Sequence, residues 1–317
     1  MSVQLPAGAD AIRATLARGF EHHRAGRFHE AESGYRRVLE ELPRQADALH
    51  LLGVLCHQTA RHAEAIEWID RAIAVDGACA DFHNNLGEAK RALGRSAQAE
   101  ADYRRALALR PDYAEALCNL GLVLCELDRA AEAATHLRRA VALKPDLAAA
   151  HDNLGVALQA LDDLDGAAAA HARAIALAPS YAKAHNNLGN VHFARDELAS
   201  AQACYRRALE IDPDYPQAHY NLANVFAARE EFDAARAEHE RAIALKPDYF
   251  DSWLNLGLVL QSLREADQAI ALLGELAARY PDRAAAHAGH AAAIAGRADF
   301  AAADAGFRRA IALAPDN

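Results

Sequence analysis

Sixteen histidines are the residues of this 317-residue chain that most readily suggest metal binding or acid–base chemistry. Their spacing argues against both. The stretch FHEAES pairs His29 with Glu30 but has no second histidine four residues after the first, as a zinc-binding HExxH helix requires. Five other histidines share one recurring position, which predicts packing at a seam between helices. They are His83, His151, His185, His219 and His287.

No other catalytic pattern is present in the sequence, which has no GxSxG elbow, no GxGxxG loop and no P-loop. The adjacent carboxylates Asp162 and Asp163 fall at a turn between helices, where charged side chains are normally solvated. A catalytic site is usually built once, whereas the polar residues here recur at fixed intervals. We therefore predict that this chain is not an enzyme and needs no cofactor or metal.

Asparagine forms the most informative recurring pattern. The stretch AHNNLGN at residues 184–190 holds three asparagines, although Asn is a poor residue for a helix interior. One of them recurs every 34 residues, at Asn85, Asn119, Asn153, Asn187, Asn221 and Asn255, and a second, partial row consists of Asn190 and Asn224. A carboxamide both donates and accepts hydrogen bonds. Such a row can therefore pair with the backbone of an extended peptide without demanding particular side chains.

The elements that must position these asparagines follow from the same period. Prolines close successive units at 34-residue steps, an alanine recurs in all nine units and a glycine in seven. A period of this length is typical of stacked supersecondary units. Within residues 182–215 the pattern predicts one helix from Ala182 to Arg195 and another from Leu198 to Ile211.

Two local features of the units suggest their own explanations. The recurring glycine and alanine indicate close approach of two helix backbones, since glycine in a helix interior otherwise costs about 1 kcal/mol. The proline ends each second helix, and we expect the aspartate after it to cap the next helix. Asp112 and Glu115 have the spacing of a capping box.

Together these positions resemble the tetratricopeptide repeat. The pattern is carried in one unit by Trp253, Leu256, Gly257, Leu260, Ala269 and Pro281, and the resemblance covers about residues 12–315. It implies an all-α fold, a right-handed superhelical solenoid of nine 34-residue helix-turn-helix units. Residues 1–11 would be a lead-in, and residues 12–317 would form nine contiguous repeats in one elongated domain. On a helical wheel the asparagines lie away from the packing seam, on the face that lines the concave groove in this family.

The resemblance implies a protein–protein interaction scaffold that binds extended peptide segments in this groove through an asparagine ladder. The wording AHNNLGN is also similar to arrays that precede O-GlcNAc transferase-type glycosyltransferases, where such a ladder holds the substrate backbone. The alternative is therefore the substrate-recognition array of a bacterial glycosyltransferase whose catalytic domain is absent from this chain. A third interpretation is pure assembly, and the asparagines could also serve the hydrogen bonding of the repeat itself. A two-carboxylate clamp is disfavoured, because no Lys or Arg directly precedes an asparagine of the ladder; only Lys183 is placed to contribute.

Composition limits the remaining classes of partner and location. The net charge of −10 and the acidic middle of the chain disfavour nucleic acid. No apolar run of 18 residues is present, which predicts no membrane span. The first twenty residues lack the uninterrupted apolar core of a signal peptide, and the five cysteines are scattered, so we expect a cytoplasmic protein.

The last repeat predicts a partner of its own. Its second helix, about residues 300–313, carries Phe307, Ile311 and Leu313, and no later helix of the chain covers them. A terminal repeat normally needs a polar outer face. We therefore expect a longer protein, or a cover supplied by another copy or a partner, including a homo-oligomer through this helix.

Overall fold

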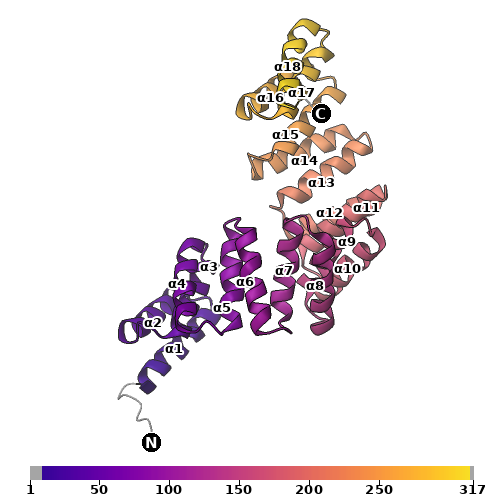
Figure 1. Ribbon diagram of the computed structural model, residues 1–317. Helices are drawn as coiled ribbons and strands as arrows, with labels where there is room; N and C mark the ends of the chain where they lie inside the picture. Colours follow the sequence, from indigo (N-terminus) through magenta and orange to yellow (C-terminus); the bar gives the residue numbers. More distant parts are fainter. Residues whose placement is uncertain (1–8, 315–317) are drawn as a thin grey trace, which may run out of the picture. The chain divides into compact units, whose positions relative to one another are not determined.

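A computed structural model describes residues 9–314, and all the elements in this range are α-helices. The chain divides into two compact units, Met1–Asp163 and Leu164–Asn317, which are described separately. Odd-numbered helices are the first, or A, helices of their repeats, and even-numbered helices are the second, or B, helices. Figure 1 shows the helices in chain order.

Unit 1 contains nine helices in its described part. They are α1 (Ala9–Arg24), α2 (Phe28–Glu41), α3 (Ala46–Gln58), α4 (His62–Val75), α5 (Ala80–Ala92), α6 (Ser96–Leu109), α7 (Ala114–Glu126), α8 (Ala130–Leu143) and α9 (Ala148–Ala160). Unit 2 contains nine more among its described residues. They are α10 (Leu164–Leu177), α11 (Ala182–Ala194), α12 (Leu198–Ile211), α13 (Pro216–Ala228), α14 (Phe232–Leu245), α15 (Phe250–Ser262), α16 (Ala266–Arg279), α17 (Ala284–Gly296) and α18 (Phe300–Leu313).

The predicted fold class, an all-α helical repeat solenoid, is confirmed. Within the described part of each unit, a helix packs only on the helices next to it in sequence, and an A helix also packs on the neighbouring A helices. The predicted helix bounds in residues 182–215 agree with α11 and α12 to within one residue. The first helix begins at Ala9, inside the predicted lead-in of residues 1–11. The superhelical handedness and the single domain remain predictions.

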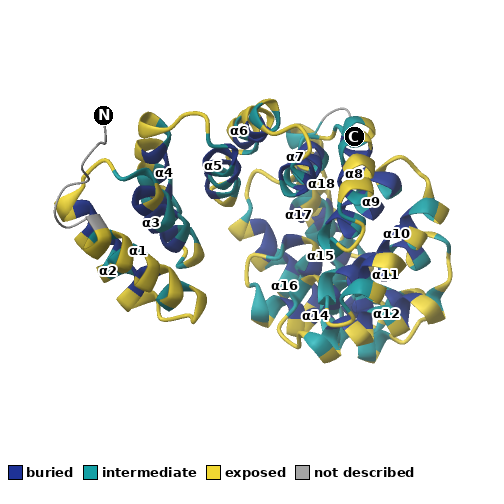
Figure 2. Cartoon of the chain, turned by 90° about the horizontal axis from the view of Figure 1, so that it is seen from below, coloured by how far each residue is buried: buried dark blue, intermediate teal, exposed yellow. Residues whose placement is uncertain are grey.

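Alanine forms the smallest and most regular part of the core. The recurring alanine of every B helix is at most 2% exposed: Ala31, Ala65, Ala99, Ala133, Ala167, Ala201, Ala235, Ala269 and Ala303. In Figure 2 the buried residues lie on the sides where helices of one unit face each other, while the turns are mostly exposed. The amphipathic pattern of each helix thus buries one face against its neighbours.

The glycine of the A helices has a different role from the predicted one. A Cβ on Gly87 would lie 2.6 Å from the Tyr103 ring, and one on Gly189 would lie 2.5 Å from the Tyr205 ring. Both tyrosines are almost fully buried. The glycine therefore makes room for a large side chain sixteen residues later, on the B helix of the same repeat. The close approach of two helix backbones, which the sequence suggested, is therefore not the main reason for the glycine.

The predicted aspartate caps are wrong. Helix α7 has Tyr113 as its N-cap and no side-chain cap, and Asp112 instead accepts a hydrogen bond from Arg139 at 2.7 Å. Asp214 pairs in the same way with Arg241 at 2.9 Å. The aspartate after each proline lies one residue too early to reach the first free N–H groups of the helix. Asp112 and Asp214 each form an exposed ion pair with the next B helix instead.

Candidate functional site

The asparagine ladder of unit 1 lies on α5, α7 and α9, and its Nδ2 atoms contact the preceding A helix. Asn85 Nδ2 lies 2.8 Å from His50 Nε2. Asn119 Nδ2 donates to Asn84 Oδ1 at 3.1 Å and to Glu88 Oε1 at 2.8 Å. Asn153 Nδ2 donates to the Sγ atom of Cys118 at 3.4 Å. Each amide therefore joins one repeat to the next.

Unit 2 repeats this arrangement with both predicted rows. Asn221 Nδ2 donates to Asn186 Oδ1 and to Asn190 Oδ1, each at 2.9 Å. Asn255 Nδ2 donates to Asn224 Oδ1 at 2.9 Å and to the hydroxyl of Tyr220 at 3.3 Å. The second row, Asn190 and Asn224, thus accepts hydrogen bonds from the first. Asn187, the remaining ladder asparagine of this unit, lies on α11.

Burial limits what the ladder can offer to a ligand. Asn153 is 4% exposed and Asn187 is 9% exposed, whereas Asn85, Asn119, Asn221 and Asn255 are partly buried. The amides therefore lie between neighbouring A helices and do not project freely. Their Nδ2 groups donate hydrogen bonds to the preceding A helix. This supports the interpretation that the asparagines serve the hydrogen bonding of the repeat itself.

The acceptor half of several ladder amides remains available. No described residue donates a hydrogen bond to Oδ1 of Asn119, Asn221 or Asn255. In the second row the pattern is reversed, because Oδ1 of Asn190 and Asn224 accepts while their Nδ2 groups donate to no described residue. The two rows of unit 2 thus present acceptors and donors side by side. A peptide group needs this combination, since it has one N–H and one C=O.

The recurring histidine position has a role that the packing prediction did not contain. Its ring nitrogen bonds the carbonyl oxygen six residues earlier, in the turn that closes the previous repeat. The pairs are His83 with Gly77, His151 with Pro145, His185 with Pro179, His219 with Pro213, His287 with Pro281 and, through indole Nε1, Trp253 with Pro247. A carbonyl only accepts, so each histidine Nε2 must carry the proton. In these six repeats the position thus fastens the start of the A helix to the turn before it.

The charged side chains near the ladder are mostly paired. Glu115, at the start of α7, binds Lys144 at 2.8 Å, and this ion pair lowers the pKa of Glu115. Asp81, at the start of α5, accepts from Arg110 at 2.6 Å and from the Tyr113 hydroxyl at 2.7 Å. Burial alone would raise the pKa of Asp81, but these two partners outweigh it and lower that pKa. Each of these two carboxylates is thus neutralised by a basic partner and offers little charge to a ligand.

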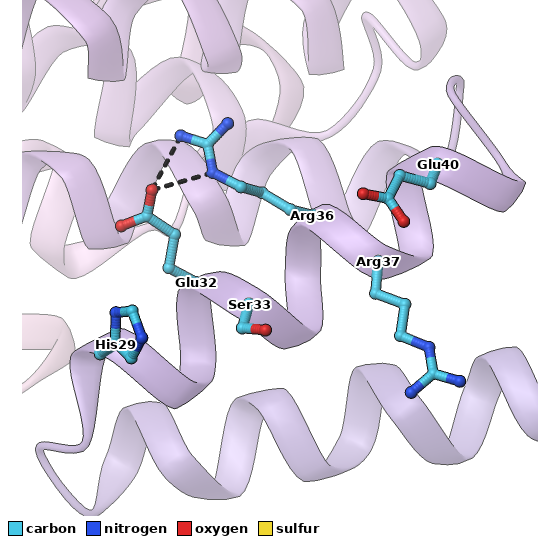
Figure 3. Close-up of a pocket in the computed structure, with 6 residues that line it drawn as sticks. All are labelled: His29, Glu32, Ser33, Arg36, Arg37 and Glu40. Carbon is cyan, nitrogen blue, oxygen red and sulfur yellow. Dashed lines mark hydrogen bonds and ion pairs between the residues drawn. The ribbon is translucent and has the colours of Figure 1, made fainter.

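One hollow with several charged side chains lies away from the ladder, along α2. Figure 3 shows that Arg36 reaches Glu32 in this hollow while Arg37 points elsewhere. Arg36 also contacts Glu64, and Arg61 binds Glu32 at 2.7 Å. These groups form an ion-pair network between α2 and α4. Within the described residues no cluster of His, Cys, Asp and Glu has the geometry of a metal site. No described helix combines the length and apolarity that a membrane crossing requires.

Comparisons with known proteins agree with this geometry. Sequence profiles described as tetratricopeptide repeat or TPR repeat match residues 7–82, 79–146, 189–229, 223–263 and 251–283. No curated protein matches the chain. None of the matching profiles describes a glycosyltransferase, so the similarity to O-GlcNAc transferase-type arrays is not confirmed.

Solved structures show the same fold. A tetratricopeptide repeat protein from Parabacteroides merdae has a TM-score of 0.65 at 15% identity, covering 80% of this chain and 100% of that one. TTC0263, a thermophilic TPR protein of Thermus thermophilus, has a TM-score of 0.53 at 25% identity, covering 58% and 100%. A chain of the APC/C hetero-tetramer Cut9-Hcn1 has a TM-score of 0.68 at 16% identity, covering 94% and 55%. The profile matches run through more than half of the chain, which therefore belongs to the tetratricopeptide-repeat family.

Proposed function

We propose that this protein is a non-enzymatic scaffold that binds extended segments of protein partners on its A helices. Proteins with this fold generally serve as protein-interaction scaffolds. The contact residues are the ladder asparagines, Asn85, Asn119 and Asn153 in unit 1 and Asn187, Asn221 and Asn255 in unit 2, with Asn190 and Asn224 beside them. One observation carries the proposal: the ladder amides are held by their Nδ2 atoms while several Oδ1 atoms receive no described hydrogen bond.

The fixed amide planes favour backbone recognition. An amide whose Nδ2 donates to two acceptors, as in Asn119, Asn221 and Asn255, cannot rotate freely. Its Oδ1 is then a preorganised acceptor for a peptide N–H, which reduces the entropy lost on binding. Packed helices lie about 8–10 Å apart, and an extended peptide advances about 3.3 Å per residue. One ladder asparagine would therefore meet about every third residue of the ligand.

The test separates binding from stability within unit 2. The double variant Asn221→Ala, Asn255→Ala removes two ladder acceptors. The control Gln202→Ala removes a buried amide that accepts from Arg229, and so weakens contacts between repeats without changing an A helix. Each lost hydrogen bond is worth about 0.5–1.5 kcal/mol, so we expect the double variant to bind about tenfold more weakly.

The probe is a set of 12-residue peptides selected by the wild-type protein from a random displayed library, with affinities measured by fluorescence anisotropy. Circular dichroism checks that both variants keep their helical content. Affinity that the double variant retains in full, or that Gln202→Ala lowers equally, would mean that the ladder serves only the array. Failure of the library to yield any binder would also contradict the proposal.

We further propose a second copy of this chain as a partner at α18. Phe307 and Ile311 are 38% and 61% exposed, and they border a groove floored by alanines of α17. Leu313, the third residue of the predicted apolar surface, is only partly exposed. Large side chains beside a groove of small ones are self-complementary, which suits a twofold interface.

A further inference from the structure

The ladder positions of the first two repeats are apolar. Ala17 on α1 and Leu51 on α3 stand where later repeats carry a ladder asparagine, and Phe20 and Val54 stand where repeats of unit 2 carry Asn190 and Asn224. Phe20 is 45% exposed, although an aromatic side chain normally gains from burial. The row of A helices in unit 1 therefore changes from carboxamides to hydrocarbon toward its first repeat.

These side chains form an apolar groove, defined by Leu16, Phe20, Leu51 and Val54. It consists of two adjoining hollows of about 370 and 410 Å³ that share Phe20 and Leu51. Each hollow is large enough for a bulky side chain, and both are open to solvent. Pockets that bind ligands are typically lined by apolar groups with a few polar groups placed at the edge.

The apolar groove is continuous with the ladder. His50 lines it, and Nε2 of the same residue lies 2.8 Å from Nδ2 of Asn85, the first ladder asparagine. The imidazole ring also lies 4.4 Å from the Phe82 ring on α5, measured between centroids. A single side chain thus forms both a wall of the groove and the hydrogen-bond partner of the ladder. A peptide that lies on the ladder of unit 1 meets the groove as its next contact.

The edge of the groove is basic. Arg13 and Arg24 line it, both are exposed, and neither forms an ion pair with another described residue. Arg36 and Arg61 differ in this respect, since they are engaged by Glu32 and Glu64. Asp47 is the one carboxylate among the described residues that line the two hollows, and it accepts a hydrogen bond from the Gln45 amide. The local charge therefore favours an anionic group on the ligand.

We propose that the apolar groove takes a large apolar side chain of the extended segment bound by unit 1, with a neighbouring carboxylate of that segment held by Arg13 or Arg24. This inference rests on the proposed function and names the class of segment: an extended peptide with a hydrophobic residue next to an acidic one. The ladder binds the backbone without selecting side chains, and the groove supplies the selection.

The variant Phe20→Asn, Leu51→Asn tests the groove. Because Leu51 also packs against the core of unit 1, circular dichroism checks that the variant keeps its helical content. The variant gives the first two repeats the residues that repeats of unit 2 already carry at the same positions. The new amide at position 51 can donate to the new amide at position 20, as Asn221 donates to Asn190. The matched control is Leu258→Asn, which removes a 50% exposed leucine three residues after Asn255, at the helix position equivalent to Phe20.

The probes are paired synthetic peptides. Each pair consists of a 12-residue peptide selected by the wild type and the same peptide with its apolar residue replaced by glycine. We expect the wild type and Leu258→Asn to prefer the apolar member at least tenfold, and Phe20→Asn, Leu51→Asn to prefer it less than twofold. Replacing Arg13 and Arg24 by Gln should abolish the preference for a peptide with the acidic residue over the same peptide with that residue replaced by its amide.

The outcomes separate this inference from the proposed function. Suppose that Asn119→Ala weakens the binding of both peptides of a pair equally, while Phe20→Asn, Leu51→Asn (the groove variant) still prefers the apolar peptide. The proposed role of the ladder then stands, and the groove inference is overturned. If the groove variant loses the preference but Asn119→Ala changes nothing, the groove stands and the ladder fails. Selected peptides without an apolar–acidic pattern would overturn the inference. So would sedimentation showing that the groove variant abolishes self-association, because a second copy would then occupy the groove.

Discussion

His219 makes two hydrogen bonds that require both of its ring nitrogens to be protonated. Nε2 lies 3.0 Å from the carbonyl oxygen of Pro213, and Nδ1 lies 2.6 Å from a carboxylate oxygen of Glu238. Burial lowers the pKa of His219, but the bonds to Glu238 and Pro213 outweigh it, so the pKa rises above its usual 6.5. The imidazolium form is therefore stabilised in the folded protein.

This geometry predicts a pH-dependent stability. A raised folded-state pKa contributes stability that is complete below about pH 6.5 and is lost as the pH rises through the folded-state pKa. His219→Trp keeps one N–H toward the Pro213 carbonyl, as Trp253 does toward Pro247, but cannot titrate. We expect the thermal midpoint of the wild type to fall relative to that of His219→Trp between pH 6 and pH 8. Glu238→Gln should also remove this dependence of the thermal midpoint on pH. The same pH dependence in all three proteins would contradict the assignment of the raised pKa to His219 and its bond with Glu238.

The sequence predicts which residues recur at this scale, but not what their polar atoms bind. The histidine position was predicted to pack at a helix seam; His83 is buried, whereas His151, His185, His219 and His287 are only partly buried. The bond from the ring nitrogen to the carbonyl six residues earlier depends on the turn geometry, which the period does not encode. The ladder was predicted by position. Its donor bonds to the preceding helix, such as that from Asn221 to Asn190, depend on the stagger of neighbouring A helices.

At the scale of elements, the turn from A to B helix is the most regular local feature. One residue per repeat has a positive φ: Gly26, Ala60, Gly94, Asp128, Asp162, Asp196, Glu230, Arg264 and Ala298. In the second repeat, the Ala60 N–H donates to the carbonyl oxygen of His57, and the Arg61 N–H donates to the carbonyl oxygen of Cys56. This is the Schellman pattern of a helix C-terminus. This left-handed residue suits glycine, yet only two of the nine positions carry it.

Reciprocal substitutions at two of these turns measure the cost of the left-handed residue. Ala60→Gly should stabilise the protein, because a positive φ costs an alanine about 1 kcal/mol or more of conformational free energy. Gly94→Ala should destabilise it by a similar amount, since no atom lies within 4 Å of the added Cβ and only the backbone conformation changes. Urea titrations followed by circular dichroism give the two midpoints. Shifts of the same sign would show that the turn conformation does not set the stability of these repeats.

Helix bounds were predicted more accurately than helix caps. The 34-residue period gave the bounds of α12 to the residue, because apolar spacing and proline both mark them. The predicted capping by Asp112 failed, since the helix begins one residue later than a cap at this position requires. The reason for the recurring glycine also could not be deduced, because the partner of Gly87 is Tyr103 on the other helix of its repeat.

For the whole molecule, every described contact within a unit joins helices that are near in sequence. A solenoid of this kind gains stability from nearest-neighbour interfaces, so a helix with a neighbour on one side keeps an apolar face exposed. Among the described helices, only α17 packs on α18. Phe307 and Ile311 remain exposed there beside Ala284, Ala285 and Ala288 of the groove.

This exposed face predicts that the 317-residue chain self-associates. In a twofold arrangement Phe307 and Ile311 of one copy enter the alanine-lined groove of the other, and the same contact forms twice. Burying a Phe or Ile side chain is worth about 1.5–3 kcal/mol, so loss of one such contact per copy should be visible in the dimer equilibrium. Ile311→Glu should therefore shift sedimentation velocity profiles to the monomer at concentrations where the wild type dimerises. The control Phe300→Glu changes a 71% exposed residue of the same helix that does not line the groove, and it should leave the dimer intact. If the wild-type chain stays monomeric at every concentration, the predicted self-association is wrong. If Phe300→Glu dissociates the dimer as readily as Ile311→Glu, the contact lies elsewhere than in this groove.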